Sequence, residues 1–383
     1  MRGHITKRGR KWACVFDAPP DGSGKRKRRW LSGFTTRKAA EAALSDALAS
    51  MQKGAYTEPT KETVATFMRR WLQSAKASVR PATWATYETL AEKHIIRALG
   101  AVLLQQLSVP QLNTFYADLL ETGRRDGKGG LSPRTVHHIH AVIRRALGAA
   151  VRWQLLARNV ADLADPPQGA KTSMRVWSSA EVAAFLASVR EDRLYGVYVL
   201  ALTTGMRRSE LLGLVWRDVD FDAARLQVRQ TLISVNFKAQ LSEPKTDAGR
   251  RAIDLDPGTV GAIRTHRSHQ LEERFALGLG RPGPDDFVFT APTGEALHPA
   301  LFSDAFERHV KASGLPLIPF HSVRHTSATL ALAAGVHPKV VQERLGHASV
   351  AITLDLYSHS VPSLQIDAAA KMGELLFASG GAH

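Results

Sequence analysis

The chain has 383 residues, 44% of them hydrophobic and 22% charged, which is typical of a globular protein of about two or three domains. Its formal net charge of +16 favours a polyanionic partner, with DNA or RNA ahead of a membrane surface. The single cysteine, Cys14, excludes an internal disulfide framework and a cysteine-based zinc site. Because there is also no apolar run of about 18 residues and no signal peptide, we expect a cytoplasmic protein.

Residues 1–55 are predicted to form a small basic unit of strands backed by one helix. The alternating apolar pattern at 12–16 is typical of a half-buried strand, and a Pro/Gly-rich turn separates it from a returning strand at 25–30. Thr35 or Thr36 can cap the helix that follows. A run of cations on a strand is either a solvated edge that blocks aggregation or a DNA-facing ribbon, and the basic charge of the chain favours the ribbon. The candidate DNA-binding residues are Lys25, Arg26, Lys27, Arg28 and Arg29.

Residues 60–162 change character and are predicted to form a compact bundle of helices. Four amphipathic stretches follow Thr63, Pro81, Ser108 and Ser132. A hydroxyl at the N-cap satisfies free backbone N–H groups, and a proline is tolerated in the first turn. These signals therefore predict four helices joined by short loops.

Residues 162–173 are rich in proline and glycine and are predicted to be a linker. Beyond it, Ser178 and Glu181 form a capping box at the start of a new helix. Helical runs then surround a strand-rich stretch at 225–256, in which a polar loop separates two strands. The helical runs are predicted at 180–190, 194–204, 257–276, 300–312, 322–334 and 338–345.

The chain is therefore predicted to be multidomain and mainly α. We expect a small β-sheet-plus-helix domain at the N-terminus, a helical bundle, and a mixed α+β domain at the C-terminus. The predicted boundaries are 1–55, 60–162 and 174–383.

The third predicted domain contains an ordered set of cations, histidines and one tyrosine. Breaking a phosphodiester without water requires a nucleophile, cations on the non-bridging oxygens, and groups that accept and donate protons. A tyrosine phenol has a pKa of about 10, so it needs nearby positive charge or a base to attack at neutral pH. Arginine binds phosphate through two parallel hydrogen bonds and keeps its charge, so two arginines can replace a divalent ion. The candidate residues are Arg207, Lys245, His321, Arg324, His347 and Tyr357.

In both order and local sequence this set resembles the catalytic domain of the tyrosine recombinases, the phage-integrase family. The segment TGMRRSEL at 204–211 resembles the motif of the first catalytic arginine, and PKT at 244–246 resembles the hairpin that carries the lysine. HSVRHT at 321–326 is similar to the H-x-x-R box, although the family more often has Leu where Val323 stands. LGH at 345–347 matches the second histidine, and the tyrosine before SH matches the nucleophile.

The resemblance implies a role for each residue. Tyr357 would attack the scissile phosphate and become joined to the 3′-phosphate, and Arg207 and Arg324 would bind the non-bridging oxygens. His347 would add a donor, Lys245 would protonate the departing 5′-oxygen, and His321 would assist proton transfer at the tyrosine. Glu210, one helical turn from Arg207, is placed to hold that arginine. No nucleotide cofactor and no metal ion is needed, because the phosphotyrosine keeps the bond energy.

The resemblance extends to the rest of the chain. Residues 60–162 are similar to the core-binding domain, and 1–55 resemble the arm-binding domain of integrases from phages and conjugative elements. It implies a homotetramer on double-stranded DNA attachment sites, strand exchange through a Holliday junction, and a C-terminal helix around 363–377 that docks on a neighbouring protomer. An accessory DNA-bending protein or directionality factor is a further expected partner.

Three alternatives stay open at the level of sequence. A recombinase that resolves chromosome dimers would have the same catalytic residues, but it typically lacks the basic N-terminal unit. A non-catalytic DNA-binding regulator explains the net charge but not the six matched residues. A metal-dependent nuclease would need a cluster of acidic ligands, which the sequence does not show.

Overall fold

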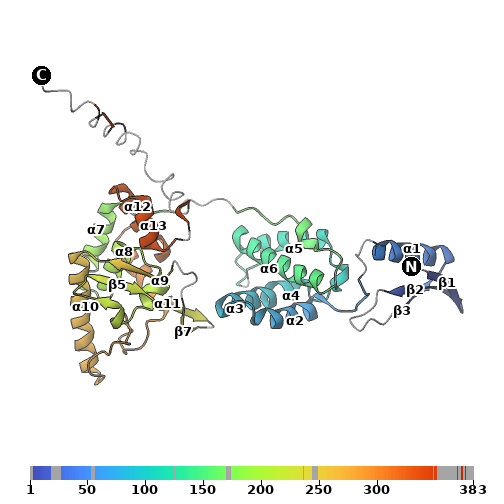
Figure 1. The fold of residues 1–383 in the computed structure, drawn as a ribbon, viewed down its shortest axis with the longest axis horizontal. Coiled ribbons are helices and arrows are strands. Elements are labelled where there is room, and N and C mark those ends of the chain that lie inside the picture. The colour runs from blue at the N-terminus through green and yellow to red at the C-terminus, as the bar shows by residue number, and fades with distance from the viewer. Residues whose placement is uncertain are drawn as a thin grey trace. The chain divides into compact units, whose positions relative to one another are not determined.

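The computed structural model describes residues 3–18, 27–52, 57–124, 126–169, 174–235, 237–243, 249–347 and 349–351, with 369, 372, 373 and 376. The chain divides into two compact units, Met1–Lys171 and Thr172–His383. Both contain more helix than strand, which confirms the predicted mainly-α, multidomain class (Figure 1). No helix within the described residues is long and apolar enough to cross a membrane.

The first unit begins with a three-stranded antiparallel sheet of order β1-β2-β3, against which α1 packs. The core between them includes Cys14 and Phe16 of the sheet and Ala47 and Met51 of the helix. The Thr36 hydroxyl accepts a hydrogen bond from the amide of Ala39, so the predicted helix cap is confirmed. The elements are β1 (Gly3–Arg8), β2 (Lys11–Ala18), β3 (Lys27–Phe34) and α1 (Arg37–Gln52).

Strand β1 was not predicted, because its sequence GHITKR is short and largely polar. It becomes a strand through pairing with β2, in the register Ile5 opposite Cys14. Of the five candidate DNA-binding cations, Lys27, Arg28 and Arg29 lie on β3. Lys25 and Arg26 lie outside the described residues.

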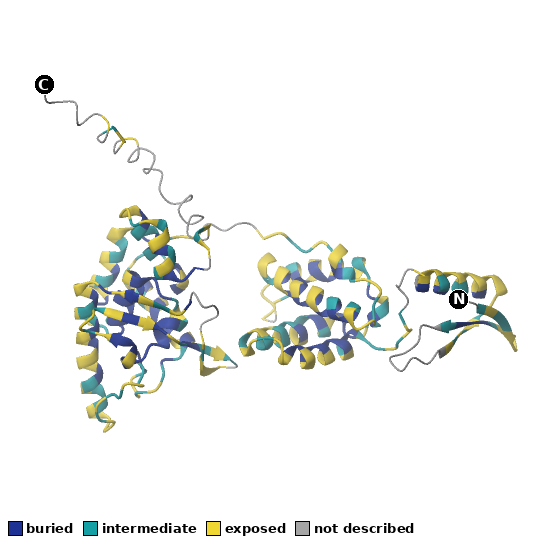
Figure 2. Cartoon of the chain, in the orientation of Figure 1, coloured by how far each residue is buried: buried dark blue, intermediate teal, exposed yellow. Residues whose placement is uncertain are grey.

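The remainder of the first unit is a helical bundle with its own apolar core (Figure 2). Thr63, Ser108 and Ser132 all stand at N-caps, as predicted, and Pro81 opens the second helix. That helix continues through a π-helical turn into a short α-helix, and no sequence signal indicated this change of winding. The elements are α2 (Val64–Lys76), α3 (Pro81–Leu90), η1 (Ala91–Ile95), α4 (Ile96–Leu99), η2 (Leu104–Gln106), α5 (Val109–Thr122), α6 (Pro133–Arg152) and η3 (Val160–Leu163).

The second unit is built around α8, whose sequence YGVYVLALTT is apolar on all sides. A helix of this kind must be buried, and α8 packs against α7, α9, α10 and α12. The helices are α7 (Ser179–Ser188), α8 (Tyr195–Thr204), α9 (Arg208–Leu212), η4 (Trp216–Asp218), α10 (Pro257–Ala276), α11 (Pro299–Ala312), α12 (Phe320–Ala333) and α13 (Pro338–Leu345).

The strands of this unit form a sheet of order β4-β5-β8 and a separate hairpin, β6-β7. The two strands predicted at 226–228 and 251–253 are confirmed, and the structure shows that they pair, since β5 lies antiparallel to β8. The prediction of a polar loop between these strands is wrong. The intervening segment contains the β6-β7 hairpin, in which Leu232 lies opposite Leu241. The strands are β4 (Val219–Asp220), β5 (Arg225–Val228), β6 (Thr231–Val235), β7 (Lys238–Ser242) and β8 (Arg251–Asp254).

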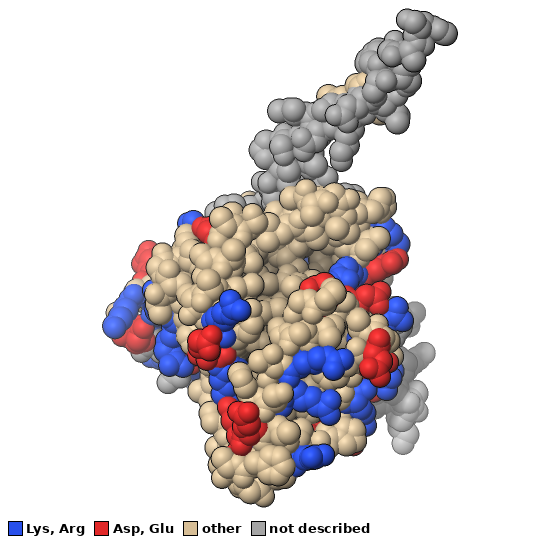
Figure 3. Space-filling view, turned by 90° about the vertical axis from the view of Figure 1, so that its left-hand side faces the viewer, with Lys and Arg blue, Asp and Glu red and all other residues tan. Residues whose placement is uncertain are grey.

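Helix α10 lies along one edge of the second unit, away from α9 and α11 (Figure 1). Viewed from that edge, basic side chains are interspersed with acidic ones (Figure 3). The positive charge of the chain is therefore not gathered into one uniform patch on this face.

Candidate active site

Four helices bring together those predicted site residues of the second unit that the structure describes. Arg207 is the N-cap of α9, which begins shortly after α8 ends. His321 and Arg324 belong to the first turns of α12, and His347 follows the end of α13. Since α8 contacts α9 and α12, and α12 contacts α13, segments far apart in sequence meet at one place.

Arg324 is buried, with only 4% of its surface exposed, and its guanidinium is held by two backbone carbonyls. One Nη1–H donates to the oxygen of Gly205 at 2.8 Å, and one Nη2–H donates to the oxygen of Leu345 at 2.7 Å. Both carbonyls stand at helix C-termini, where backbone acceptors lack intrahelical partners. Burial and the charge of Arg207 lower the pKa of Arg324, and an arginine so placed still stays charged at neutral pH. Two of its five N–H donors are thus used for anchoring.

Two glycines at helix ends position the backbone carbonyls that hold the arginines. Gly205 ends α8 and Gly346 ends α13, both in the left-handed region, with φ of 63° and 66°. A Cβ at Gly205 would stand 2.4 Å from Cδ2 of Leu345, so a side chain there would be strained and would also clash. The oxygen of Gly346 accepts a bond of 3.1 Å from Nη2 of Arg207. The glycines of the TGMR and LGH segments therefore anchor the two arginines.

A buried carboxylate joins Arg207 to a second arginine. Glu210 is 2% exposed and accepts from Nη1 of Arg207 at 2.6 Å, as predicted. It also accepts from Nη1 and Nη2 of Arg251, at 3.2 and 2.9 Å. Burial acts to raise the pKa of the Glu210 carboxyl, but the hydrogen bonds and charges of the two arginines outweigh it and lower the pKa. The carboxylate therefore stays ionised and balances part of the positive charge.

Arg251 was not predicted as a site residue. It lies on β8, with its side chain 7% exposed, and its Nε–H donates to the oxygen of Arg344 at 2.5 Å. The sequence has 51 lysines and arginines, and nothing near Arg251 in the sequence indicates that its side chain is buried. Its partner Glu210 is 41 positions away, so only tertiary packing reveals the pair.

Three histidines lie beside the arginines, and all have lowered pKa values. Burial, followed by the charges of Arg324 and Arg207, lowers the pKa of His347 to about 4. Burial and the neighbouring His321 lower the pKa of His325 to about 4 as well. Partial burial and Arg324 lower the pKa of His321, whose ring stands edge-on to that of His325 at 5.0 Å. At neutral pH these rings are uncharged, so His321 can accept a proton while His347 can still donate a hydrogen bond.

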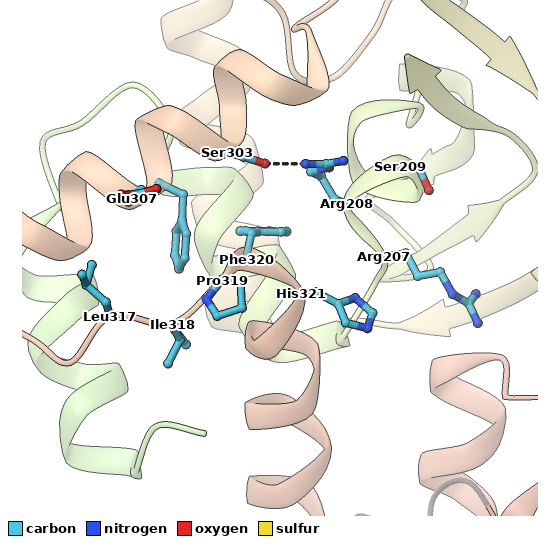
Figure 4. Close-up of a pocket in the computed structure, with 11 residues that line it drawn as sticks. Arg207, Arg208, Ser209, Ser303, Glu307, Leu317, Ile318, Pro319, Phe320 and His321 are labelled. Atoms are coloured by element: carbon cyan, nitrogen blue, oxygen red, sulfur yellow. Dashed lines mark hydrogen bonds between the residues drawn. The ribbon is translucent and has the colours of Figure 1, made fainter. Parts of the chain in front are cut away.

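A cavity of about 650 Å³ opens beside Arg207 and His321 (Figure 4). It extends from these two residues towards α11, where Ser303 accepts a hydrogen bond from Arg208, and Glu307 and Leu317 lie at the far side (Figure 4). Its wall on the side of α11 and of the segment before α12 is largely apolar. The charged site thus continues into a hollow large enough for part of an extended ligand.

The structure brings together Arg207, Glu210, His321, Arg324 and His347. Lys245 and Tyr357 lie outside the described residues, so their positions stay predictions. Among the described residues, no group of three or more His, Cys, Asp or Glu side chains is placed to hold a metal ion. What this geometry offers is a set of fixed guanidinium donors with neutral imidazoles beside them, which suits a phosphate group.

Three family models match successive parts of the chain. The arm DNA-binding domain matches residues 4–51, and the N-terminal SAM-like domain of phage integrase matches 63–120. The phage integrase family model matches 177–363, the region that contains the arginines and histidines described above.

Curated relatives are similar over nearly the whole chain. A tyrosine recombinase XerC-like protein of Caldanaerobacter subterraneus subsp. tengcongensis is 26% identical over 374 residues, which cover 93% of this chain and 94% of the relative. The ICEBs1 integrase of Bacillus subtilis is 26% identical over 313 residues, covering 81% and 83%. The chain therefore spans most of the length of both relatives.

Solved structures share the fold. The Tn1549 transposon integrase in complex with a circular intermediate DNA has a TM-score of 0.66 at 23% identity, covering 82% of this chain and 99% of that one. A lambda integrase tetramer bound to a Holliday junction has a TM-score of 0.60 at 17% identity, covering 92% and 94%. At these identities the similarity shows the common fold.

Proposed function

Since the chain belongs to the phage integrase family of tyrosine recombinases, we propose that it is a site-specific DNA recombinase that integrates or excises a phage or other mobile element. One observation carries this proposal most directly. Arg207 and Arg324 are both anchored by carbonyls at helix ends, beside neutral His321 and His347. Such an arrangement offers fixed positive charge to a phosphate without a metal ion.

The proposed reaction is a pair of transesterifications. The oxygen of Tyr357 attacks the scissile phosphorus, and the bond from phosphorus to the 5′-oxygen breaks as the bond to tyrosine forms. His321 accepts the phenol proton, and Lys245 gives a proton to the departing 5′-oxygen. Arg207, Arg324 and His347 stabilise the charge on the non-bridging oxygens. The 5′-hydroxyl of a partner strand then attacks the phosphotyrosine, so each step exchanges one phosphoester for another and no nucleotide cofactor is consumed.

We propose that double-stranded DNA attachment sites are the substrate and that four protomers act together on two sites. The solved relatives described in complex with circular intermediate DNA, and as a tetramer on a Holliday junction, support this assembly. The proposed division is an arm-type DNA-binding domain at 1–55, a core-binding domain at 60–162 and a catalytic domain at 174–383. The matches to the three family models, in the same order, support it.

A recombinase that resolves chromosome dimers is the second candidate, and the XerC-like name of one relative favours it. The match to an arm DNA-binding domain at 4–51 favours the mobile-element function instead. A deletion of residues 1–55 separates the two. For an integrase it should weaken binding to accessory arm sites more than binding to the crossover core, whereas equal loss at both would contradict the arm-binding role.

The nucleophile is tested with a nicked suicide substrate, in which cleavage traps the covalent protein–DNA adduct. Tyr357→Phe should abolish the adduct and leave DNA binding nearly intact, because only the attacking oxygen is removed. Undiminished adducts in that variant would overturn the assignment of Tyr357. Cleavage by the unaltered chain should persist in excess chelator, and its loss there would favour a metal-dependent nuclease.

A further inference from the structure

Arg208 is an exposed arginine in the cavity beside the site, and the proposed reaction does not use it. Its guanidinium donates a hydrogen bond to the hydroxyl of Ser303 on α11, which fixes its direction (Figure 4). Within the part of the chain that the structure describes, Arg208 forms no ion pair with a carboxylate. The acidic residue that lines the same cavity, Glu307, pairs with Lys311 at 2.6 Å. Arg208 is therefore a fixed cation without a counter-charge.

Among the described residues the charge of Arg208 has no carboxylate partner, which is energetically unfavourable, and an anionic ligand would offset this cost. Partial burial lowers the pKa of Arg208, which means that the protein environment disfavours its charge. Arg207, the preceding residue, has its charge balanced by Glu210, whereas Arg208 has only a hydroxyl as its described partner. An arginine held in one direction but left without an anion is matched to an anionic ligand.

The direction of Arg208 separates its ligand from the scissile phosphate. Figure 4 shows Arg207 and Arg208 diverging, with Arg208 reaching towards Ser303 on α11. Successive phosphates of one DNA strand are offset by about 3.4 Å along the helix axis, so consecutive arginines that diverge can bind consecutive phosphates.

The wall of the cavity suits the sugar between two such phosphates. Leu317 is 56% exposed, and Ile318 and Phe306 also line the hollow. Leu317 lies on the side of the cavity away from Arg207 and Arg208 (Figure 4). An exposed leucine is unfavourable in water but is covered when the carbon-rich face of a deoxyribose packs on it. The charge and the apolar wall therefore fit different parts of the same nucleotide.

We infer that this cavity is a subsite for the nucleotide next to the scissile phosphate, with Arg208 binding that nucleotide's phosphate and Ser303 fixing the guanidinium. The inference rests on the proposed recombinase function and extends it by a DNA-positioning residue. A contact one phosphate from the reaction aligns the strand for attack, because phosphate contacts set register and small misplacements cost large factors in rate.

The test combines a binding measurement with a rate measurement on the full chain. The observed binding constant is measured against salt concentration on a core-site duplex and on an unrelated duplex, and single-turnover cleavage is measured on the nicked suicide substrate. Arg208→Ala should reduce the slope of log K against log salt by about 0.9, equally on both duplexes, and should slow cleavage about 10- to 100-fold. Arg208→Lys should restore the slope but not the full rate, since lysine lacks the bidentate fork.

Two further variants distinguish positioning from folding. Ser303→Ala should leave the salt slope unchanged and still slow cleavage, because the charge remains but its direction is lost. Arg217→Ala is the matched control: this arginine of the same unit is half-exposed and pairs with Asp285, so its loss should change neither quantity.

An unchanged slope in Arg208→Ala would overturn the inference, and so would a loss confined to the core-site duplex, which would indicate base reading. The salt slope does not depend on cleavage. A chain that binds with the expected slope but forms no adduct would therefore contradict the proposed function and leave the subsite intact.

Discussion

Replacing Gly205 with alanine should destabilise the second unit and disturb the Arg324 site. An L-residue in the left-handed region, here at φ 63°, costs about 1–2 kcal/mol. The new Cβ would also lie 2.4 Å from Cδ2 of Leu345 and 3.2 Å from the hydroxyl of Ser327. Leu345 is itself buried at 2% exposure, so its side chain has little space to move, and overpacking of this kind costs about 1–3 kcal/mol. We expect a total loss of about 2–5 kcal/mol in the free energy of unfolding.

Gly314 provides a matched control for the backbone cost alone. It has a φ of 68°, and a Cβ there would meet no atom within 4 Å. Gly314→Ala should therefore lose only the cost of the left-handed conformation, about 1–2 kcal/mol. Urea unfolding of both variants gives the two losses, and cleavage of the suicide substrate should fall only in Gly205→Ala, because the carbonyl of Gly205 holds Arg324.

A double-mutant cycle isolates the clash. If the Cβ strikes Leu345, then Leu345→Ala should be less costly in the Gly205→Ala background than in the original chain, with a coupling of about 1–3 kcal/mol. If Gly205→Ala lost no more stability than Gly314→Ala, and cleavage were retained, the assignment of Gly205 as the anchor of Arg324 would be refuted.

Three other outcomes follow from the same structure. The folded-state pKa of His347, about 4, lies below the unfolded value of about 6.5, so the unfolded chain binds more protons between these pH values. The contribution of His347 to stability should therefore fall by up to about 3 kcal/mol as the pH drops through this window. His347→Gln should reduce the pH slope of stability in urea titrations, and the rest of the slope should remain because the pKa of His325 is also lowered to about 4. Glu210→Gln leaves Arg251 buried without a counter-charge and should lower the free energy of unfolding by about 3–5 kcal/mol. The control Glu307→Gln removes an exposed ion pair and should lower it by less than about 1 kcal/mol. Equal losses for the two variants in chemical unfolding would contradict the buried network. Ser132→Ala removes the N-cap of α6 and should lower the free energy of unfolding by about 1 kcal/mol, whereas an unchanged value would mean that the cap is not used.

Local sequence was sufficient for most helices of the chain. Thr63 and Ser132 cap helices because their hydroxyls reach the amides of residues three positions on, an interaction that depends only on nearby residues. Strand β1 and the hairpin β6-β7 were missed for the opposite reason. Strand β1 is short and largely polar, and β6 is short, so each is stabilised mainly by its partner strand, and the pairing partner is not a local property of the sequence.

For the site, the order of motifs in the sequence determined which residues to consider, from Arg207 to Tyr357. It also determined the pairing of Arg207 with Glu210, because these residues lie one helical turn apart. Lys245 and Tyr357 stay predictions of the sequence, since they lie outside the described residues.

Only the tertiary structure decided how the arginines are held. The bonds of Arg324 to Gly205 and Leu345, and of Glu210 to Arg251, join positions that are far apart in sequence. They form because the apolar helix α8 is buried at the centre of its unit and the ends of α9, α12 and α13 gather around its C-terminus. The sequence thus determined which chemical groups the site contains. The burial that lowers the histidine pKa values, and the carbonyl contacts that orient the guanidinium groups, arose from tertiary packing.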